Sequence, residues 1–205
     1  MRAYKYKSAF NELYDFEGFN VCGFLQASDK MEVYLKRTRK TGICPVCKKE
    51  RRKVSEICLR TVRDLDVSGK KCYLRFESYH INCSCGYKGM EQLAFIEKYD
   101  RYTKRFSEFV ALLCQKMSLS DVAKITKINW KTAKRIDKEK LKELVTDLKT
   151  INPKRIGVDE IAYEKGHKYL TIVRDLDCGV IWVGKDRKKE TLDEFFKELG
   201  KEKSK

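Results

Sequence analysis

The sequence predicts an α+β chain of several domains, because three patterns follow one another along its 205 residues. Between residues 44 and 85, apolar and polar residues alternate as they do in strands. From about residue 101 to 148, apolar residues recur every three to four positions, as in helices. After Asn152-Pro153, which disfavours a continued helix, the strand-like alternation returns. We therefore expect a small β-rich domain, a helical domain and a second α/β domain.

The composition is that of a folded protein without a membrane segment. Apolar residues make up 42% and aromatic residues 11% of the chain, which is enough for packed cores. No apolar run approaches the roughly 18–20 residues that cross a bilayer, and the start of the chain has no signal-peptide core. We therefore expect a cytosolic protein.

The net charge of +16 is confined to the first three-quarters of the chain. Residues 156–205 hold eleven Lys or Arg and eleven Asp or Glu, whereas residues 1–155 hold thirty-five and nineteen. Such an asymmetry indicates that the first part meets a polyanion and the last part has another role. A basic surface that only keeps the protein soluble is the alternative.

The first two segments are predicted to be rich in strands. Residues 1–43 form a β-structured lead-in, in which short apolar runs alternate with charged residues. In the next domain, residues 44–95, the alternation at 72–80 predicts a strand. Ser68-Gly69 supplies a turn before that strand.

Two cysteine pairs in this domain have the spacing of metal ligands. Cys44 and Cys47 are separated by two residues, so that one tight turn points both thiolates at one ion. Cys83 and Cys85 supply the second half of a four-ligand site, although they are separated by one residue instead of the regular two. We expect structural zinc held by these four cysteines in a zinc-ribbon-like domain. His80 could replace one thiolate, and a ribbon without metal, held by packing, is the alternative.

The remaining cysteines are expected to be small buried apolar side chains, since each stands alone in the sequence. A disulfide framework is not expected, because the cytosol keeps thiols reduced. These isolated cysteines are Cys22, Cys58, Cys72, Cys114 and Cys178.

Residues 96–151 predict a helix-turn-helix. Ser118 can accept a hydrogen bond from the amide of Asp121 and so start a short first helix. After a three-residue turn, Asn129 can cap the second helix. A preceding helix at about 106–117 would brace the pair.

The second helix has a predicted packing face and a basic face. A basic stripe on the second helix of a tight pair is what docking in the DNA major groove requires. An ordinary amphipathic helix with a solvated lysine face is the alternative. The packing face comprises Trp130, Ala133, Ile136, Leu141, Leu144 and Leu148. Six residues of this helix are expected to bind DNA. Lys131, Thr132 and Arg135 should face bases, and Lys138 and Lys142 should mainly contact phosphates. Lys134 is the sixth.

Residues 152–205 predict three strands and a helix, at 156–163, 169–175, 180–184 and 191–199. Asp159 lies within the first, apolar strand, where a buried carboxylate is costly unless it is hydrogen-bonded or binds metal. Nucleases of the RNase H type hold divalent metal with such a first-strand aspartate. A turn-proximal or salt-bridged aspartate is the alternative. Glu160 points to the opposite face of the strand.

Three stretches of this sequence resemble one protein family. They are Gly157–Asp177 continuing through Gly184 and Glu190–Phe196, the run Tyr102-Thr-Lys-Arg-Phe106, and the run Asn129-Trp-Lys-Thr-Ala-Lys-Arg-Ile-Asp137. Together they are similar to the insertion-sequence DDE transposases of the ISL3 family, in that family's order. The cysteine pairs occupy the place of the family's N-terminal zinc-binding domain. The resemblance covers about residues 13–200.

This resemblance implies a cut-and-transfer enzyme acting on double-stranded DNA, at transposon terminal inverted repeats, with two magnesium or manganese ions. Asp159 falls at the family's first catalytic carboxylate, and residues 152–205 fall at the start of its RNase H-like domain. The family's second Asp and its Glu are expected beyond Lys205. We therefore expect a truncated, catalytically incomplete transposase that binds transposon-end DNA in a bacterial or archaeal cytoplasm, associated with the nucleoid.

Three other functions are compared with the same residues. A stand-alone DNA-binding regulator that represses an intact transposase fits all of them, as a homodimer or in association with that transposase. An active transposase would need the missing carboxylates from another chain. An RNA-binding zinc-ribbon protein would leave the helix-turn-helix and the acidic strand without a role.

Overall fold

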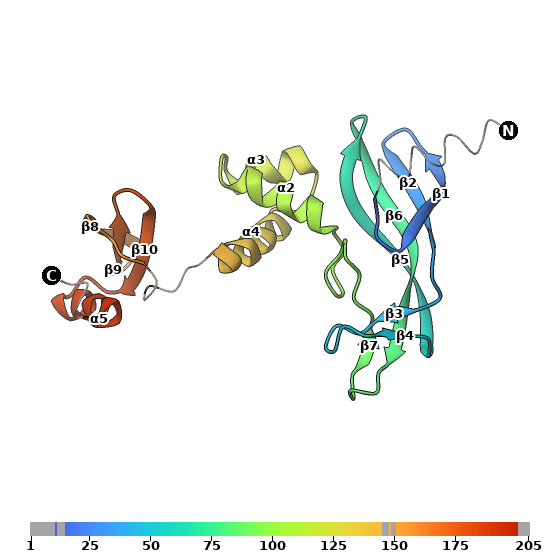
Figure 1. The fold of residues 1–205 in the computed structure, drawn as a ribbon. Helices are drawn as coiled ribbons and strands as arrows, with labels where there is room; N and C mark the ends of the chain where they lie inside the picture. The colour runs from blue at the N-terminus through green and yellow to red at the C-terminus, as the bar shows by residue number, and fades with distance from the viewer. Residues whose placement is uncertain (1–10, 12–14, 145–147, 149–150, 201–205) are drawn as a thin grey trace. The chain divides into compact units, whose positions relative to one another are not determined.

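The computed structural model describes residue 11 and residues 15–144, 148 and 151–200. The chain divides into two compact units, Met1–Lys140 and Leu141–Lys205, and each is described by itself (Figure 1). The first unit contains a β-sheet followed by helices, and the second contains strands followed by a helix.

The first unit is built on a five-stranded sheet. Its strands are β1 (Phe19–Gln26), β2 (Lys30–Arg37), β5 (Val54–Val67), β6 (Lys70–Asn82) and β7 (Lys88–Met90). Their order is β1-β2-β6-β5, and β7 pairs with β6. The pair β1–β2 is antiparallel, β2 runs parallel to β6, and β5 and β6 form a long hairpin. The strands expected in the lead-in 1–43 thus lie in the same sheet as those expected in 44–95.

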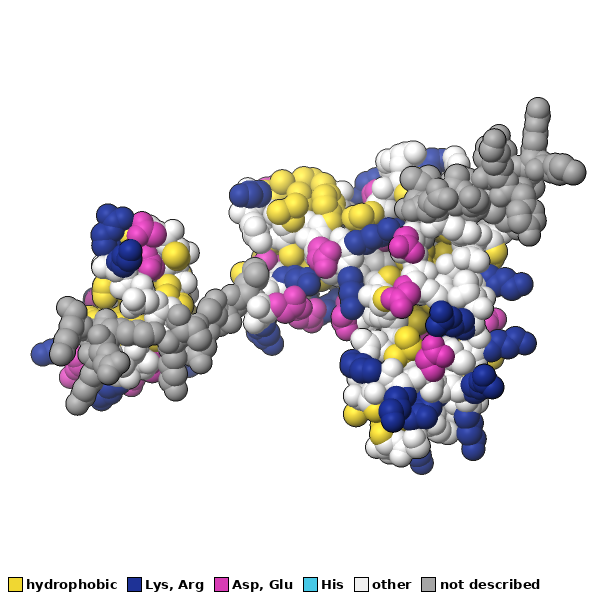
Figure 2. All heavy atoms as spheres, viewed as in Figure 1, with side chains coloured by type: hydrophobic (Ala, Val, Ile, Leu, Met, Phe, Trp, Pro, Cys, Tyr) yellow, Lys and Arg dark blue, Asp and Glu magenta, His cyan; other side chains and the backbone are white. Residues whose placement is uncertain are grey.

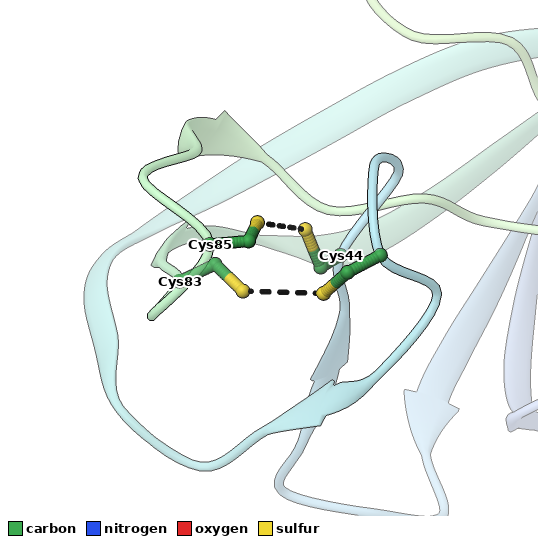
Figure 3. Close-up of side chains that lie close together, drawn as sticks. Cys44, Cys83 and Cys85 are labelled. Carbon is green, nitrogen blue, oxygen red and sulfur yellow. Dashed lines mark hydrogen bonds between the residues drawn. The ribbon is translucent and has the colours of Figure 1, made fainter.

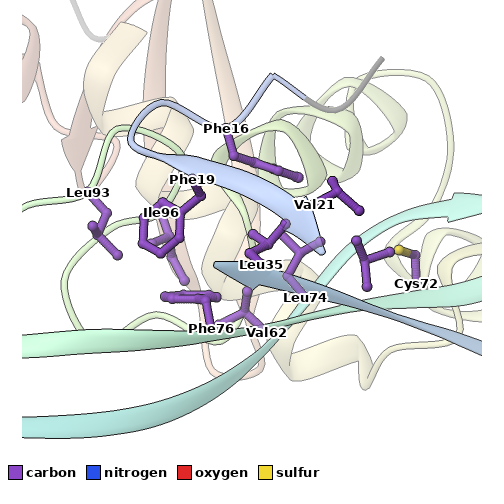
Figure 4. Packing of buried hydrophobic residues seen from close by; sticks show 11 residues of the cluster. Phe16, Phe19, Val21, Leu35, Val62, Cys72, Leu74, Phe76, Leu93 and Ile96 are labelled. Atoms are coloured by element: carbon purple, nitrogen blue, oxygen red, sulfur yellow. The ribbon is translucent and has the colours of Figure 1, made fainter. Parts of the chain in front are cut away.

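The core of this sheet explains why β1 and β2 join it. Val33 on β2 and Leu74 on β6 are fully buried in one apolar cluster. Figure 4 shows this cluster, with Leu74 labelled among its members. The rings of Phe19, Phe76 and Phe95 pack edge to face, with centroids 5.2 to 5.6 Å apart. Edge-to-face pairs add to the free energy gained by burial. Strands far apart in the sequence are therefore held together by one shared apolar face.

The turn between β5 and β6 confirms the prediction for Ser68-Gly69. Both residues have positive φ, 51° for Ser68 and 75° for Gly69. Two-residue hairpins favour this left-handed backbone because its twist matches that of the flanking strands. Beside the sheet, β3 (Gly42–Ile43) and β4 (Glu50–Arg51) form a short two-stranded ribbon.

The helical part of the first unit consists of α2 (Lys104–Cys114), α3 (Leu119–Thr126) and the part of α4 (Trp130–Leu144) up to Lys140. The expected brace at 106–117 corresponds to α2. The apolar sides of the three helices meet in one core, which contains Phe106, Val110, Val122, Ala133 and Ile136.

A buried carboxylate joins the sheet to the first of these helices. Asp64 on β5 accepts hydrogen bonds from the hydroxyl of Thr103 and from Nε of Arg105, both over 2.7 Å. Thr103 is the N-cap of α2 and accepts in turn from the N–H of Phe106. The carboxylate of Asp64 is fully buried, and these donors compensate its charge. The start of α2 is therefore fixed on β5.

The second unit is an antiparallel sheet with one helix. Its elements are β8 (Ile156–Glu164), β9 (Lys168–Asp175), β10 (Gly179–Lys185) and α5 (Lys189–Leu199). They confirm the three strands and the helix expected after residue 152. The strand order is β10-β9-β8, so that β8 and β10 are the outer strands of the described sheet. Val173 and Phe195 are fully buried in its core, beside Leu148 and Leu199.

Within the described part of the chain, no helix has both the length and the apolar character needed to cross a membrane.

Candidate metal centre and nucleic-acid interface

Four cysteines come together at the end of β6 (Figure 3). Cys44 and Cys47 lie between β3 and β4, and Cys83 and Cys85 follow β6. The Sγ atoms of Cys44 and Cys85 are 3.7 Å apart, and those of Cys47 and Cys83 are 3.4 Å apart. Thiolates bound to one tetrahedral zinc at 2.3 Å would be roughly 3.8 Å apart. The sequence-predicted ligands therefore form a four-cysteine cluster of a size that fits a metal ion.

The short spacing between Cys83 and Cys85 is accommodated by a tight turn. The N–H of Cys83 donates to the carbonyl of Tyr87 over 2.8 Å, and the N–H of Gly86 donates to the carbonyl of Cys83 over 3.0 Å. Gly86 has φ 91°, a conformation that favours glycine. This turn brings both sulfur atoms to the same side, so a regular two-residue spacing is not needed.

Arg51 on β4, which sequence reasoning missed, lies beside the cluster. Its Nε donates to Sγ of Cys83 over 3.0 Å. The pKa of Cys83 is lowered to about 6, first by a backbone hydrogen bond from Cys85 and further by Arg51. A backbone hydrogen bond also lowers the pKa of Cys47. A backbone hydrogen bond lowers the pKa of Cys85 too, but contact with Cys83 and burial outweigh it and raise that pKa to about 11. Thiolates are the metal-binding form, and two of the four thiols are more acidic than an ordinary thiol.

The isolated cysteines are less uniformly buried than the sequence suggested. Of the five, Cys72 is buried, in the core of the sheet. Cys58 and Cys114 are half-buried, whereas Cys22 and Cys178 are exposed. Cys22 lies at a register shift of β1, and Cys178 lies in the turn between β9 and β10, so neither faces a core.

The helices α3 and α4 have the caps that the sequence predicts. Oγ of Ser118 accepts from the N–H of Asp121 over 3.2 Å. Lys127 ends α3 in the left-handed conformation, with φ 54°. Oδ1 of Asn129 accepts from the N–H of Lys131 over 2.9 Å, at the start of α4. These contacts confirm the helix-turn-helix, with α2 packed against it.

The predicted packing face of α4 is only partly buried. Ala133 and Ile136 are buried, but Trp130 and Leu141 are 50% and 49% exposed. The expectation for these two residues is wrong, because the described helical core reaches only Ala133 and Ile136 on this helix. Leu148 is buried in the core of the second unit instead. The side chain of Leu144 lies outside the described residues.

The predicted DNA-binding side chains of α4 face solvent. Five of the six are exposed, and Thr132 is half-buried. The exposed residues are Lys131, Lys134, Arg135, Lys138 and Lys142. On the face drawn in Figure 2, further Lys and Arg side chains are spread over the β-rich part of the first unit. The first unit therefore offers positive charge both on α4 and around the sheet.

Arg135 differs from these lysines because it is held by two carboxylates. Its guanidinium lies 2.8 Å from Glu139, one turn along α4, and 3.2 Å from Asp100. Neither partner was predicted from the sequence, although the four-residue spacing of Arg135 and Glu139 is typical of helix ion pairs. Arg135 is therefore positioned before any ligand is bound.

Asp159 lies on the outer strand β8 and is exposed. The prediction that its strand buries it is wrong for the described residues, because nothing described covers residues 158–164 of β8. Its Oδ1 accepts from the N–H of Glu160 over 2.8 Å. Two clusters of three or more metal-ligand side chains occur among the described residues, and Asp159 belongs to neither.

Two segments of the chain match one protein family. Residues 91–139 match the helix-turn-helix domain of transposase family ISL3, and residues 156–205 match the transposase of the same family. The chain belongs to the ISL3 family of transposases. The first ISL3 segment contains α2, α3 and most of α4, and the second contains Asp159. The four cysteines lie outside both segments.

Two curated relatives carry transposase names. The transposase for insertion sequence element IS1001 of Bordetella parapertussis is 33% identical over 171 residues, which are 82% of this chain and 42% of the relative. The transposase for insertion sequence element IS1557 of Mycobacterium tuberculosis is 31% identical over 153 residues, 71% of this chain and 33% of the relative. The chain thus spans less than half the length of either relative. No solved structure matches it.

Proposed function

We propose that this ISL3-family chain binds the terminal inverted repeats of an insertion sequence, with α4 in the major groove. The observation that carries the proposal is the exposed basic stripe on the second helix of a capped helix-turn-helix. In this motif the second helix enters the groove and its first turns reach the base edges. Lys131, Thr132 and Arg135 are placed to contact bases, and Lys138 and Lys142 to contact phosphates.

The test is a titration of duplex DNA by fluorescence anisotropy at several salt concentrations. One duplex carries the ends of the insertion sequence, a second has the same composition in scrambled order, and a third is RNA. The end duplex should bind most tightly. Equal binding of the end and scrambled duplexes would contradict sequence recognition, and preference for RNA would favour an RNA-binding protein.

A charge-matched pair of variants locates the binding surface. Lys131→Gln with Lys134→Gln removes two positive charges from α4, and Lys165→Gln with Lys189→Gln removes two exposed ones from the second unit. Removing one lysine that neutralises a phosphate should reduce the salt slope by about 0.9. The α4 variant should therefore show a slope smaller by up to about two units, and the control an unchanged slope. Equal reductions in both variants would mean that α4 is not the binding surface.

We also infer that the four-cysteine cluster holds structural zinc. Two sulfur–sulfur distances of 3.7 and 3.4 Å, close to those around a tetrahedral zinc ion, and the acidic thiols of Cys83 and Cys47 support this assignment. Zinc bound by small folds contributes on the order of 10 kcal/mol of apparent free energy. Elemental analysis should show that Cys47→Ser binds one zinc fewer than the wild type. When that ion is lost, the backbone amides of residues 44–90 should be the first to lose their protection from hydrogen exchange. A Cys47→Ser variant with unchanged zinc content and stability would overturn the assignment.

For catalysis, we assign Asp159 as one carboxylate of the divalent-ion site that the ISL3 family implies. A two-metal site needs several carboxylates, and Asp159 stands alone among the described residues, so no catalytic step follows for this chain. We expect neither the wild type nor Asp159→Ala to nick or join transposon-end DNA with magnesium or manganese. Nicking by the wild type that disappears in Asp159→Ala would show that the site is complete.

A further inference from the structure

A second group of metal-ligand side chains lies on the β5–β6 strand pair. Glu56 and Cys58 are on β5, and His80 is on β6. Their ligand atoms, a carboxylate oxygen, a sulfur and an imidazole nitrogen, all lie within 4.8 Å of one another. Glu56 is the direct ladder partner of His80, and Cys58 is two residues further along the same face. The strand register itself therefore brings the three side chains together.

A register shift between Val54 and Glu56 contributes to this arrangement. Val54 pairs with Ile81, whereas Glu56 pairs with His80, so Ser55 is an extra residue in β5. Such bulges re-aim neighbouring side chains. Oγ of Ser55 donates to the carbonyl of His80 over 3.0 Å and closes the bulge. As a result, Val54 packs in the core beside the four-cysteine cluster, while Glu56 faces the other side of the sheet.

The second group is separate from the four-cysteine cluster. Tyr79 and Ile81 pack against Cys44 and Cys83. Because successive side chains of a strand point to opposite faces, His80 points away from those cysteines. The two groups therefore share no ligand, and His80 does not substitute for a thiolate of the first cluster.

We propose that Glu56, Cys58 and His80 form a second metal site, which takes a borderline divalent ion such as Zn²⁺. Thiolate, imidazole and carboxylate are the three ligand types that zinc accepts. Tetrahedral bonds of 2.0–2.3 Å place ligands roughly 3.3–3.8 Å apart, so the group must contract slightly. The exposed side chain of Glu56 can do this by a change of rotamer. Cys58 and His80 are half-buried, and water completes the fourth position.

An ion at this site would cross-link β5 to β6. The same two strands lead into the segments that carry the four cysteines. Binding should therefore stabilise the hairpin without touching the basic helix, and the inference does not depend on DNA binding.

The test measures metal stoichiometry on the full chain after equilibration with micromolar Zn²⁺ and removal of unbound ion. The wild type should hold two zinc ions per chain, and Cys58→Ser and His80→Gln should each hold one. Cys178→Ser and His167→Gln are the matched controls and should hold two. The chain has two histidines, so long-range ¹⁵N spectra can assign the coordinated imidazole directly.

Cobalt gives a readout that a folding defect would not imitate. The first equivalent of Co²⁺ should bind four thiolates at the four-cysteine cluster, and the second equivalent should bind one more, that of Cys58. The second equivalent should therefore raise the thiolate-to-cobalt charge-transfer absorbance by about a quarter. That increment should vanish in Cys58→Ser while the first step remains. A wild-type zinc content, whether one or two ions per chain, that neither Cys58→Ser nor His80→Gln lowers would overturn the proposal. Loss of the second zinc in His167→Gln alone would show an adventitious site and would overturn it equally.

Discussion

The guanidinium of Arg51 donates a hydrogen bond from Nε to Sγ of Cys83 over 3.0 Å. The same group reaches Oγ of Ser84 over 2.9 Å, so that its orientation is fixed from two sides. Four thiolates around one zinc leave an excess of negative charge, and a charged donor to one sulfur offsets part of it. Arg51 therefore belongs to the surroundings of the proposed metal centre without being one of its four cysteine ligands.

Replacing Arg51 should weaken zinc binding at the four-cysteine cluster. Removing an outer donor to a metal ligand usually costs 10–100-fold in affinity, and we expect Arg51→Ala to fall in about that range. The affinity is measured for the first equivalent of metal, in competition with a chromophoric chelator. Arg52→Ala removes an exposed neighbouring charge and should keep the wild-type affinity. Equal affinities of Arg51→Ala and Arg52→Ala would contradict this role.

The contact between Asp64 and Thr103 predicts a large effect on stability. Asp64→Ala leaves the hydroxyl of Thr103 and the guanidinium of Arg105 without their buried acceptor. Breaking a buried charged pair costs about 3–5 kcal/mol, and we expect the lower end because Arg105 is partly exposed. Urea unfolding followed by circular dichroism measures the loss. Asp29→Ala, at an exposed turn, should change stability by less than about 0.5 kcal/mol.

Local features of this chain could be predicted from the sequence because each depends on a few neighbouring residues. The cap at Ser118, the cap at Asn129 and the Ser68-Gly69 turn all follow from the preferences of single residues for one backbone conformation. The grouping of Cys44, Cys47, Cys83 and Cys85 follows from two closely spaced cysteine pairs at the two ends of one β-rich segment. These local features were therefore predictable without knowledge of the whole fold.

Long-range relationships could not be predicted in this way. The parallel pairing of β2 with β6 brings Val33 opposite Leu74, and no local signal specifies a partner 41 residues away. The exposure of Trp130 could not be predicted for the same reason. Helical spacing shows which residues form the apolar face of α4, but not how much of that face packs against another element. The exposure of Asp159 also depends on what covers β8, which the strand's own residues do not encode.

The start of α3 should show a defined pH dependence. Oγ of Ser118 donates to Asp121 over 2.7 Å, and this contact, with Lys124, lowers the pKa of Asp121 from its usual 3.8. When a carboxyl group has a lower pKa in the folded state than in the unfolded state, it stabilises the fold at pH values above the unfolded-state pKa. That contribution is lost as the pH falls through the folded-state pKa. The stability difference between wild type and Asp121→Asn should therefore be constant above about pH 5 and shrink below pH 3.8. Thermal melts across pH 2.5–7 measure it, and a difference independent of pH would contradict the assignment.

Glu139 provides the sharpest test of the proposed docking of α4 on DNA. Its carboxylate accepts two hydrogen bonds from Nη1 of Arg135, over 2.8 and 3.0 Å. If α4 faces DNA phosphates, this carboxylate repels the DNA backbone. It also holds the guanidinium of Arg135, which should contact a base. Glu139→Gln should therefore tighten binding to duplex DNA several-fold, since an exposed pair is worth about 0.2–1 kcal/mol.

The matched variants separate an effect at this site from one of net charge. Glu190→Gln removes an exposed carboxylate from α5 and should leave the affinity unchanged. Arg135→Ala should cost about 1–3 kcal/mol on the end duplex and relax the preference at one base pair. If Glu139→Gln instead weakens binding to the end duplex alone, the carboxylate serves to aim Arg135 at its base. If Glu139→Gln and Glu190→Gln tighten binding equally on every duplex, net charge explains the gain and α4 has no special place in the complex.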